Sequence, residues 1–415
     1  MSQPIFIKGV QLNEQITNIL IENKKFVGIG TDIPVPTNAI IVNGNNFAAF
    51  PTFANGHTHA AMTLFRGYGD DLPLDIWLNE WIWPKEKNLD PEIIYWGTRL
   101  ACLEMIKSGT TAFNNMYFFL EDEARAVNDS GIRALLGNTR FGDADLLADI
   151  NVAPPDWQTE RVQYCVAPHA IYTVSELGLK RCADYCKMHN LKYHIHMSET
   201  LHEVEDCLKA HGCRPYEYLE RLGILEQMGS DFIGAHSLHL SEQEIDLIGK
   251  HHCCVAHNPN SNLKLASGHQ FMSQELSDAG AIVTLGTDGC SSSNNLDMLE
   301  ATKTMSLLQK GWRKEPTSMP CSEAFRIATE NGFKSMGIDA GRIEVGKLAD
   351  MMLVDLNNIA FIPNNNTLSN LIYSAHSDAI DTVICNGEIV MEHRKVKDEE
   401  EIVLNAKKAA KRLLA

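Results

Sequence analysis

Eight short apolar segments recur between residues 50 and 289, and stretches with helical periodicity lie between most of them. These segments cover residues 50–54, 109–113, 134–137, 164–167, 193–196, 232–236, 253–257 and 282–289. Short apolar runs that alternate with helices are typical of the buried strands of a parallel sheet. Eight such units favour a closed parallel barrel, in which functional groups gather at the C-terminal ends of the strands.

Helix start signals support this alternation. Ser241 is followed by Glu244, and Thr200 by Glu203, which is the hydroxyl-to-acid spacing of a capping box. Residues 91–107 are apolar at helical period. We therefore expect helices after several of the strands.

The two ends of the chain have a different pattern. Residues 1–50 and 341–415 contain short alternating apolar and polar runs around turn signals, and neither end alone could bury much core. The expected fold class is therefore α/β. A (β/α)8 TIM-type barrel would span residues 51–340, and residues 1–50 and 341–415 would build one small β-sandwich domain.

Composition limits the partners. The 415 residues are 44% hydrophobic and carry a net charge of -17, which argues against binding to a nucleic-acid backbone and favours a small-molecule substrate. We expect no membrane span, because no apolar run approaches the roughly 20 residues needed. We also expect a homo-oligomer, either a dimer or a tetramer.

The first residues and the cysteines bear on the compartment. The sequence begins without the charged start and apolar core of a secretory signal. The 11 cysteines are an odd number and form no Cys-x-x-Cys pair, which favours buried thiols in a reducing cytoplasm. Cys253 and Cys254 are adjacent in a strand and would face opposite ways, so we interpret them as structural.

Two histidines separated by one residue follow the first apolar segment, in the run Asn55-Gly56-His57-Thr58-His59. In an extended strand, side chains at positions i and i+2 point the same way. His57 and His59 can therefore offer imidazole nitrogens to one metal ion.

Further histidines and acids stand at the ends of later segments. His196 is followed three residues later by Glu199, and His236 and Asp288 end two other segments. An acid this close to a metal ligand can deprotonate the water that the ion activates without binding the ion itself. Together with the first pair of histidines, these residues predict a metal-dependent hydrolase.

The ordered motifs resemble the amidohydrolase superfamily, and within it the group of methylthioadenosine and S-adenosylhomocysteine deaminases. The likeness runs over nearly the whole chain. It includes Asn-Gly-His-Thr-His at 55–59, Trp-Pro-Lys-Glu at 83–86, His-Met-Ser-Glu-Thr at 196–200, Gly-Thr-Asp-Gly at 286–289 and Gly-Lys-Leu-Ala-Asp at 346–350.

This resemblance implies one divalent ion, usually zinc, with iron or manganese as alternatives. The ligands would be His57, His59, His196 and Asp288. Two-metal relatives carry a modified lysine at the end of the fourth strand, whereas this strand ends in Ala167-Pro168-His169, which favours one ion. The resemblance assigns His236, which spacing alone would count as a ligand, to the attacking water and the intermediate.

The reaction implied is hydrolytic deamination of a 5'-modified adenosine to the inosine analogue, with release of ammonia. Candidate substrates are 5'-methylthioadenosine, S-adenosylhomocysteine, 5'-deoxyadenosine and adenosine. Glu199 would move protons between the water and the purine ring, and Asp288 would orient the water and pass a proton to the leaving amine. His236 would stabilise the tetrahedral intermediate.

The resemblance also implies substrate contacts. Trp77 would pack on the ribose or thioether side, Glu86 would accept from the ribose hydroxyls, and His169 would contact the purine edge. Arg140, at the end of the third strand, would meet a carboxylate tail. The segment 141–161 is short and contains Pro154-Pro155, so a smaller 5' substituent than homocysteine could be preferred.

Two alternatives stay open. The same machinery could act on another aromatic ring, such as guanine, an oxopurine, a pterin or a triazine. A remote alternative is a barrel protein without metal or catalysis. The acid in the motif at 83–86 and the His-Gly-Cys-Arg-Pro run at 211–215 favour a nucleoside over a free base.

Overall fold

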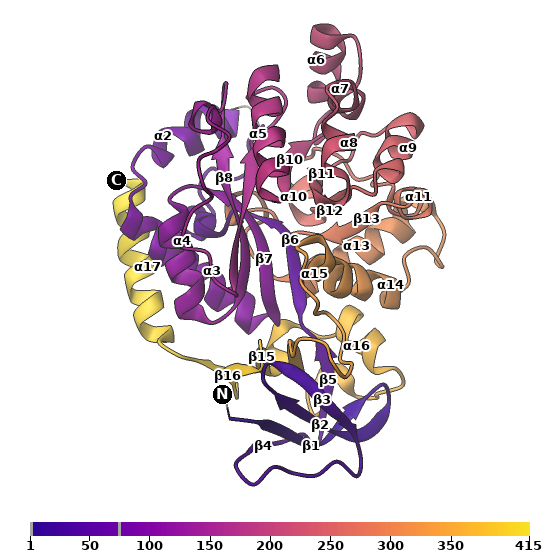
Figure 1. The fold of residues 1–415 in the computed structure, drawn as a ribbon. Coiled ribbons are helices and arrows are strands. Elements are labelled where there is room, and N and C mark those ends of the chain that lie inside the picture. The colour runs from indigo at the N-terminus through magenta and orange to yellow at the C-terminus, as the bar shows by residue number, and fades with distance from the viewer. Residues whose placement is uncertain (1–2, 74–75) are drawn as a thin grey trace.

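The computed structural model describes residues 3–73 and 76–415, which form a barrel of strands and helices above a smaller sheet (Figure 1). All eight expected segments form strands, and these pair in sequence order, parallel to one another, as one sheet. They are β6 (Phe53–Thr58), β7 (Thr110–Tyr117), β8 (Arg133–Arg140), β9 (Val162–Pro168), β10 (Tyr193–Met197), β11 (Phe232–His236), β12 (Cys254–His257) and β13 (Ile282–Leu285). The expected barrel is thereby confirmed.

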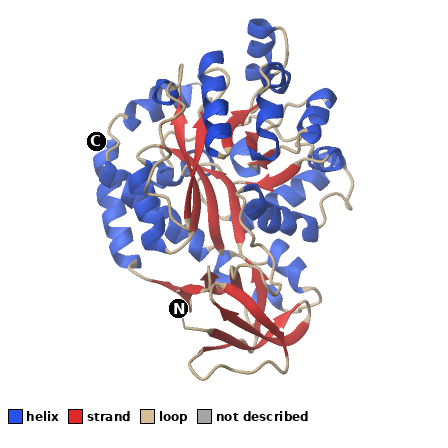
Figure 2. Ribbon diagram, viewed as in Figure 1, coloured by secondary structure: helices blue, strands red, loops and turns tan. Residues whose placement is uncertain are grey.

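Helices connect the strands and surround the sheet (Figure 2). The larger ones are α3 (Pro91–Lys107), α4 (Leu120–Ser130), α5 (Glu176–His189), α6 (Leu201–His211), α9 (Glu242–Lys250) and α13 (Met298–Arg313). The smaller ones after the strands include α7 (Pro215–Arg221), α8 (Ile224–Met228), α10 (Pro259–Lys264), α11 (Ser273–Ala279), α12 (Cys290–Ser293), α14 (Cys321–Arg326) and α15 (Gly332–Ser335). Within the described residues, no helix has both the length and the apolar character needed to cross a bilayer.

The expected helix starts are present. Ser241 and Glu244 form a reciprocal capping box at the start of α9. At α6, Thr200 accepts from the backbone of Glu203, and the Glu203 carboxylate accepts from the backbone of Ser198 and Glu199. These two bonds to the Glu203 carboxylate hold the turn that carries Glu199.

An apolar layer fills the barrel below the C-terminal ends of its strands. Each of six strands contributes one buried side chain, and Phe333 and Met336 complete the same cluster. The six are Ala54, Ala112, Leu135, Cys165, Ile233 and Cys254. Cys254 is thus a core residue, as the sequence indicated.

The barrel closes where its first and last strands meet. The strands β6 and β13 share no ladder among the described residues, but the backbone N–H of Asp288 donates to the carbonyl of His57 over 3.0 Å. The side chain of Asn55 bonds both the hydroxyl and the backbone N–H of Thr287, at 2.7 and 3.1 Å. Close approach needs glycine here, because a Cβ on Gly286 would lie 2.7 Å from the carbonyl oxygen of His57.

Both ends of the chain build the small domain, which lies at the N-terminal end of the barrel strands (Figure 1). Its strands are β1 (Ile5–Leu12), β2 (Gln15–Glu22), β3 (Lys25–Gly30), β4 (Ile40–Asn43), β5 (Phe47–Pro51), β14 (Met351–Asp355), β15 (Ile380–Cys385), β16 (Glu388–Glu392) and β17 (Lys395–Val396). They form one nine-stranded sheet in the described chain, in which β5 pairs with β14. Side chains from both chain ends share one apolar cluster, so the two ends form one small domain.

The last helix, α17 (Glu399–Leu414), does not stay with this sheet, contrary to the assignment of all of residues 341–415 to the small domain. Its residues Ala406, Ala409 and Leu413 pack in one cluster with Trp77 and with apolar side chains of α3. The backbone carbonyl of Leu414 accepts from Lys85 over 3.0 Å. An amphipathic helix docks where its apolar face finds a partner, and here the partner lies on the barrel.

We predict that Gly286→Ala destabilises the protein by about 1–3 kcal/mol, because the new methyl group would overlap the backbone of His57. The matched control is Gly311→Ala in α13, where a Cβ meets nothing within 4 Å and the helix gains up to about 1 kcal/mol. Urea unfolding of both variants measures the difference. Equal stability of the two would contradict the close packing of the barrel seam.

Candidate active site and metal centre

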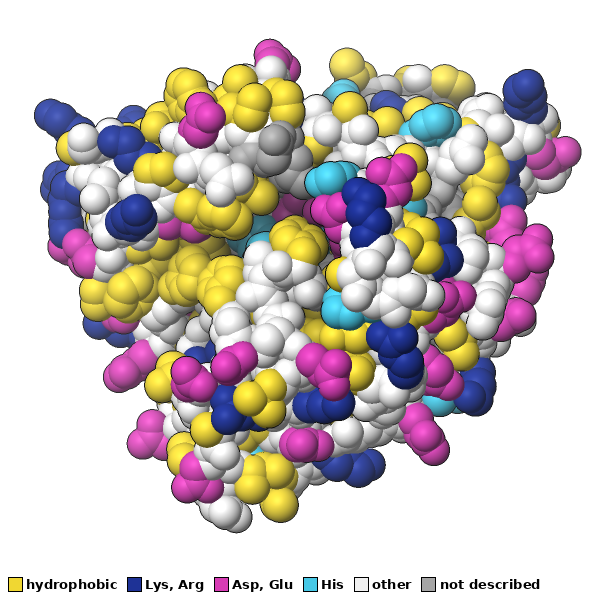
Figure 3. Space-filling view, turned by 90° about the horizontal axis from the view of Figure 1, so that it is seen from above, with side chains coloured by type: hydrophobic (Ala, Val, Ile, Leu, Met, Phe, Trp, Pro, Cys, Tyr) yellow, Lys and Arg dark blue, Asp and Glu magenta, His cyan; other side chains and the backbone are white. Residues whose placement is uncertain are grey.

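A cavity opens at the C-terminal ends of the barrel strands. Seen from above, the surface is hollowed at this end, with hydrophobic side chains around the hollow and histidine within it (Figure 3). The space between its walls, including the part open to solvent, is about 680 Å³. Two short segments after β6 form part of its rim, η2 (Trp77–Ile82) and α2 (Trp83–Glu86).

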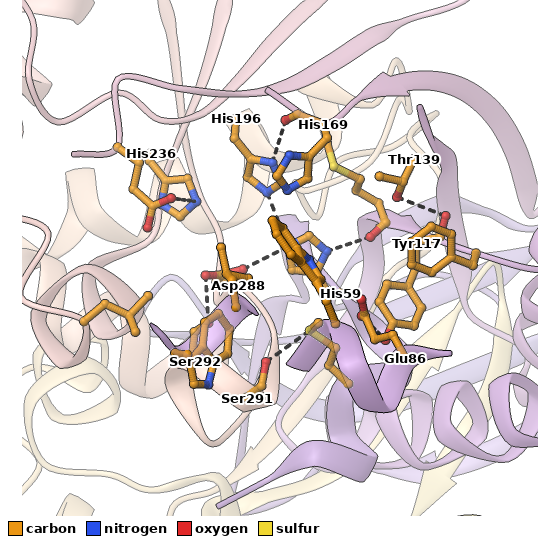
Figure 4. A pocket seen from close by; sticks show the side chains of 18 of the residues that line it. His59, Glu86, Tyr117, Thr139, His169, His196, His236, Asp288, Ser291 and Ser292 are labelled. Atoms are coloured by element: carbon orange, nitrogen blue, oxygen red, sulfur yellow. Dashed lines mark hydrogen bonds and ion pairs between the residues drawn. The ribbon is translucent and has the colours of Figure 1, made fainter. Parts of the chain in front are cut away.

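Most of the residues expected at a site line this cavity (Figure 4). They are His59, Trp77, Glu86, His169, His196, Glu199, His236 and Asp288. His57 lies just beneath and is fully buried. Arg140 is the expected site residue that does not reach the cavity.

Four of these side chains place ligand atoms close together. Nε2 of His59 lies 3.3 Å from Nε2 of His196 and 3.2 Å from Oδ1 of Asp288. Nε2 of His57 lies 3.5 Å from the same carboxylate oxygen and has no hydrogen-bond partner among the described residues, although it is buried. Three imidazoles and one carboxylate are a donor set suited to a divalent metal ion, and an unpaired buried nitrogen at their centre fits a ligand.

Backbone carbonyls orient two of the imidazoles. Nδ1 of His59 lies 2.6 Å from the carbonyl of Met116, and Nδ1 of His196 lies 2.8 Å from the carbonyl of His169. A carbonyl only accepts, so each Nδ1 carries the proton. The Nε2 lone pairs therefore face the centre of the cluster, which is the arrangement that metal ligation requires.

Burial sets the protonation of the cluster. Burial lowers the pKa of His57 to about 4 and that of His196 well below its ordinary value, so both imidazoles are neutral at neutral pH. Burial alone would raise the pKa of Asp288, but the imidazoles of His57 and His59 beside its carboxylate hold it well below its ordinary value. Neutral imidazoles and an ionised carboxylate are the forms that bind metal.

Two serines hold the outer oxygen of Asp288. The hydroxyls of Ser261 and Ser292 donate to Oδ2 over 2.6 and 2.8 Å, and the backbone N–H of Gly289 donates to Oδ1 over 2.8 Å. Neither serine was expected at the site from the sequence. Serine within one helical turn of a catalytic acid is a signal that could have found Ser292.

Glu199 lies on the turn before α6, and Glu203 holds that turn by accepting from the backbone N–H groups of Ser198 and Glu199, each over 2.8 Å. Oε2 of Glu199 lies 3.7 Å from Nε2 of His236. Burial raises the pKa of the Glu199 carboxyl, which suits a group that exchanges protons.

The ring of His236 is oriented by two amides. Its Nδ1 lies 2.9 Å from the side-chain nitrogen of Asn262 and 3.3 Å from that of Asn258. Amide nitrogens only donate, so Nδ1 accepts and the proton is on Nε2. Although Nε2 of His236 is also near the donor atoms of His57 and Asp288, a protonated Nε2 is a hydrogen-bond donor and not a metal ligand.

The opposite side of the cavity carries Glu86 (Figure 4). The hydroxyl of Tyr117 donates to Oε1 of Glu86 over 2.7 Å, and burial raises the pKa of this carboxyl. His169 is held by the hydroxyl of Thr173 at 2.8 Å and stacks on Phe141, with 5.2 Å between the ring centroids.

The structure corrects the placement of Arg140. Successive side chains of a strand face opposite ways, so Thr139 lines the cavity while the guanidinium of Arg140 lies 3.5 Å from the hydroxyl of Tyr164. No lysine or arginine of the described chain lines the cavity. The segment 141–161 contains one short helix, η3 (Asp145–Leu147), and supplies Phe141 but no cation to the lining.

Comparison with known proteins extends these observations. The model of the amidohydrolase family matches residues 48–390. A 5'-deoxyadenosine deaminase of Methanospirillum hungatei is 45% identical over 384 residues, which are 90% of this chain and 85% of the relative. A 5-methylthioadenosine/S-adenosylhomocysteine deaminase of Syntrophomonas wolfei is 43% identical over 90% of this chain and 89% of the relative.

A solved structure is also closely similar. An adenosine deaminase from Xanthomonas campestris with bound zinc superposes with a TM-score of 0.90 and 31% identity. The match covers 99% of this chain and 98% of that one.

We predict that the protein binds one divalent ion per chain and that removal of the ion lowers its melting temperature by several degrees, because only the folded state holds the donor set. Calorimetry before and after chelation, and after addition of Zn²⁺, measures this. The variant His196→Ala should lose most of the response. An equal response to Zn²⁺ in that variant would place the ion elsewhere.

Proposed function

The chain belongs to the amidohydrolase family, and on this premise we propose what its site binds and how it acts. It is a hydrolytic deaminase of adenosine analogues. The observation that carries this conclusion is one cavity that joins the histidine–aspartate cluster to Glu199 and His236 on one side and to Glu86 on the other.

A divalent metal ion belongs to this site, and we propose zinc, held by His57, His59, His196 and Asp288. The zinc in the similar adenosine deaminase structure supports this choice over iron or manganese. When bound, such an ion lowers the pKa of a water molecule towards about 7, so that hydroxide becomes available at neutral pH.

The surrounding residues supply the proton transfers. Glu199 takes the proton from the attacking water and delivers it to the ring nitrogen beside the attacked carbon, a role that its raised pKa supports. The Nε2–H of His236 donates to the oxygen that becomes bonded to that carbon. Asp288, ionised and held by two serine hydroxyls, orients the water, takes the remaining proton of the attacking oxygen and passes it to the departing amine. Water is consumed and ammonia leaves.

The lining of the cavity supports a nucleoside with an uncharged 5' substituent. Glu86 accepts from the ribose hydroxyls, and Trp83 and Phe118 lie beside it, because all three line both the cavity and an adjoining hollow. The exposed Lys87 lies at that hollow and outside the cavity. A carboxylate inside the cavity would have no cationic partner, and an unpaired buried charge is costly.

The two alternatives have less support. Relatives that act on a free ring would have no use for a ribose-binding acid, whereas Glu86 lines this cavity beside the apolar side chains. A barrel without metal would not need the ligand atoms of His57, His59 and His196 within 4.8 Å of one another, with the carboxylate of Asp288 beside His57 and His59. We therefore retain deamination of a 5'-modified adenosine.

We predict that Glu199→Gln keeps the fold and the bound metal but loses roughly 10² to 10⁴ in kcat, because the amide cannot exchange protons. Ammonia release and metal content of the same sample measure this. Glu205→Gln, an exposed change on α6, which follows the turn of Glu199, is the control and should leave kcat unchanged. Turnover within threefold of the parent in Glu199→Gln would remove this residue from the mechanism.

We predict that kcat/KM is at least about tenfold higher for 5'-deoxyadenosine and 5'-methylthioadenosine than for S-adenosylhomocysteine, because the cavity offers the carboxylate no cation. Ammonia release across these three substrates and adenosine measures the order.

In a parallel assay, Glu86→Ala should raise KM for the nucleosides. If Glu86→Ala left KM for the nucleosides unchanged and the protein also turned over a free base, the alternative of a ring substrate without ribose would be favoured.

A further inference from the structure

Another histidine contacts the proposed metal cluster from below. His194 lies on β10 two residues before His196, so both side chains face the barrel interior. Its Nε2 lies 2.9 Å from Nδ1 of His57, and the two rings are nearly perpendicular, at 85°. His194 is fully buried, and the deamination mechanism above does not use it.

His57 differs from the other two histidine ligands in what holds its outer nitrogen. Backbone carbonyls accept from Nδ1 of His59 and of His196, so their tautomers are fixed by the main chain. Nδ1 of His57 faces a second imidazole instead, and an imidazole nitrogen can either donate or accept. The tautomer of His57 therefore depends on that of His194.

Binding of a metal ion determines which tautomers His57 and His194 adopt. Nε2 of His57 is the buried, unpaired nitrogen that faces the cluster, and it needs a lone pair to bind an ion. The proton of His57 then sits on Nδ1 and is donated to Nε2 of His194. His194 must carry its own proton on Nδ1, where no partner lies within the described chain.

We propose that His194 is a positioning residue for the metal, which accepts the proton of His57 Nδ1 and thereby holds Nε2 of His57 ready to bind the ion. This rests on the proposed metal site. A neutral imidazole is a weaker acceptor than a carboxylate, so His194 fixes the ring of His57 without adding negative charge to the cluster.

The barrel offers a matched control in His257. This residue is also fully buried on a barrel strand, and both of its ring nitrogens lack a hydrogen-bond partner in the described chain. It stacks on Phe271, with 4.2 Å between the ring centroids and 3° between the planes. Loss of His257 removes a buried histidine of the same kind without removing an acceptor from a metal ligand.

The test measures Zn²⁺ affinity of the metal-free protein by competition with a chromophoric chelator, for the parent and three variants. His194→Leu should bind Zn²⁺ about 10- to 100-fold more weakly, as loss of the partner of a ligating histidine does. His194→Gln, whose amide oxygen can take the place of Nε2, and His257→Leu should both stay within threefold of the parent. Parent-like affinity in His194→Leu, or equal losses in His194→Gln and His194→Leu, would overturn the proposal.

A second measurement needs no stable leucine variant. In the zinc-loaded parent, selective ¹⁵N labelling of histidine should show His194 with its proton on Nδ1, with the signal assigned by its loss in His194→Gln. A proton on Nε2 would overturn the proposal. A parent that binds Zn²⁺ but releases no ammonia from any adenosine analogue would refute the proposed function alone, because the order of Zn²⁺ affinities would stand.

Discussion

The hydrogen bond between the backbone N–H of Asp288 and the carbonyl of His57 holds together the two ends of the barrel sheet. Each of the two residues is itself a candidate ligand, and the other candidate ligands stand on β10 and just beyond β6. The whole donor set therefore depends on β13 returning to β6 with two backbones in close contact. Gly286 and the bidentate side chain of Asn55 permit that contact.

Burial then gives this closed barrel its chemical character. Below the cluster, an apolar layer excludes water, and around it the protein supplies carbonyls, amides and hydroxyls in place of solvent. The imidazoles of His57 and His196 stay neutral because burial lowers their pKa, while the pKa of Asp288 stays low because histidine rings lie beside its carboxylate. The same buried environment thus provides both imidazole and carboxylate ligands for one ion.

Much of this could be predicted from the sequence, because strand periodicity and strand ends carry the information. The eight strands and the convergence of His57, His196 and Asp288 follow from apolar runs and the parity of side chains. Arg140 also ends a strand, but its side chain has the opposite parity to that of Thr139 and lies at Tyr164 instead of in the cavity lining. The docking of α17 and the contacts of Ser292 depend on which surfaces meet in three dimensions, and no local pattern contains that information.

The route of the last helix separates two tasks within the molecule. The ligands are fixed by the interior of the barrel, whereas the rim that carries Trp77 and Glu86 is braced from outside by α17, through apolar packing and the bond from Lys85 to Leu414. Changes in the contact between α17 and the rim can reshape recognition while leaving the donors of the ion undisturbed.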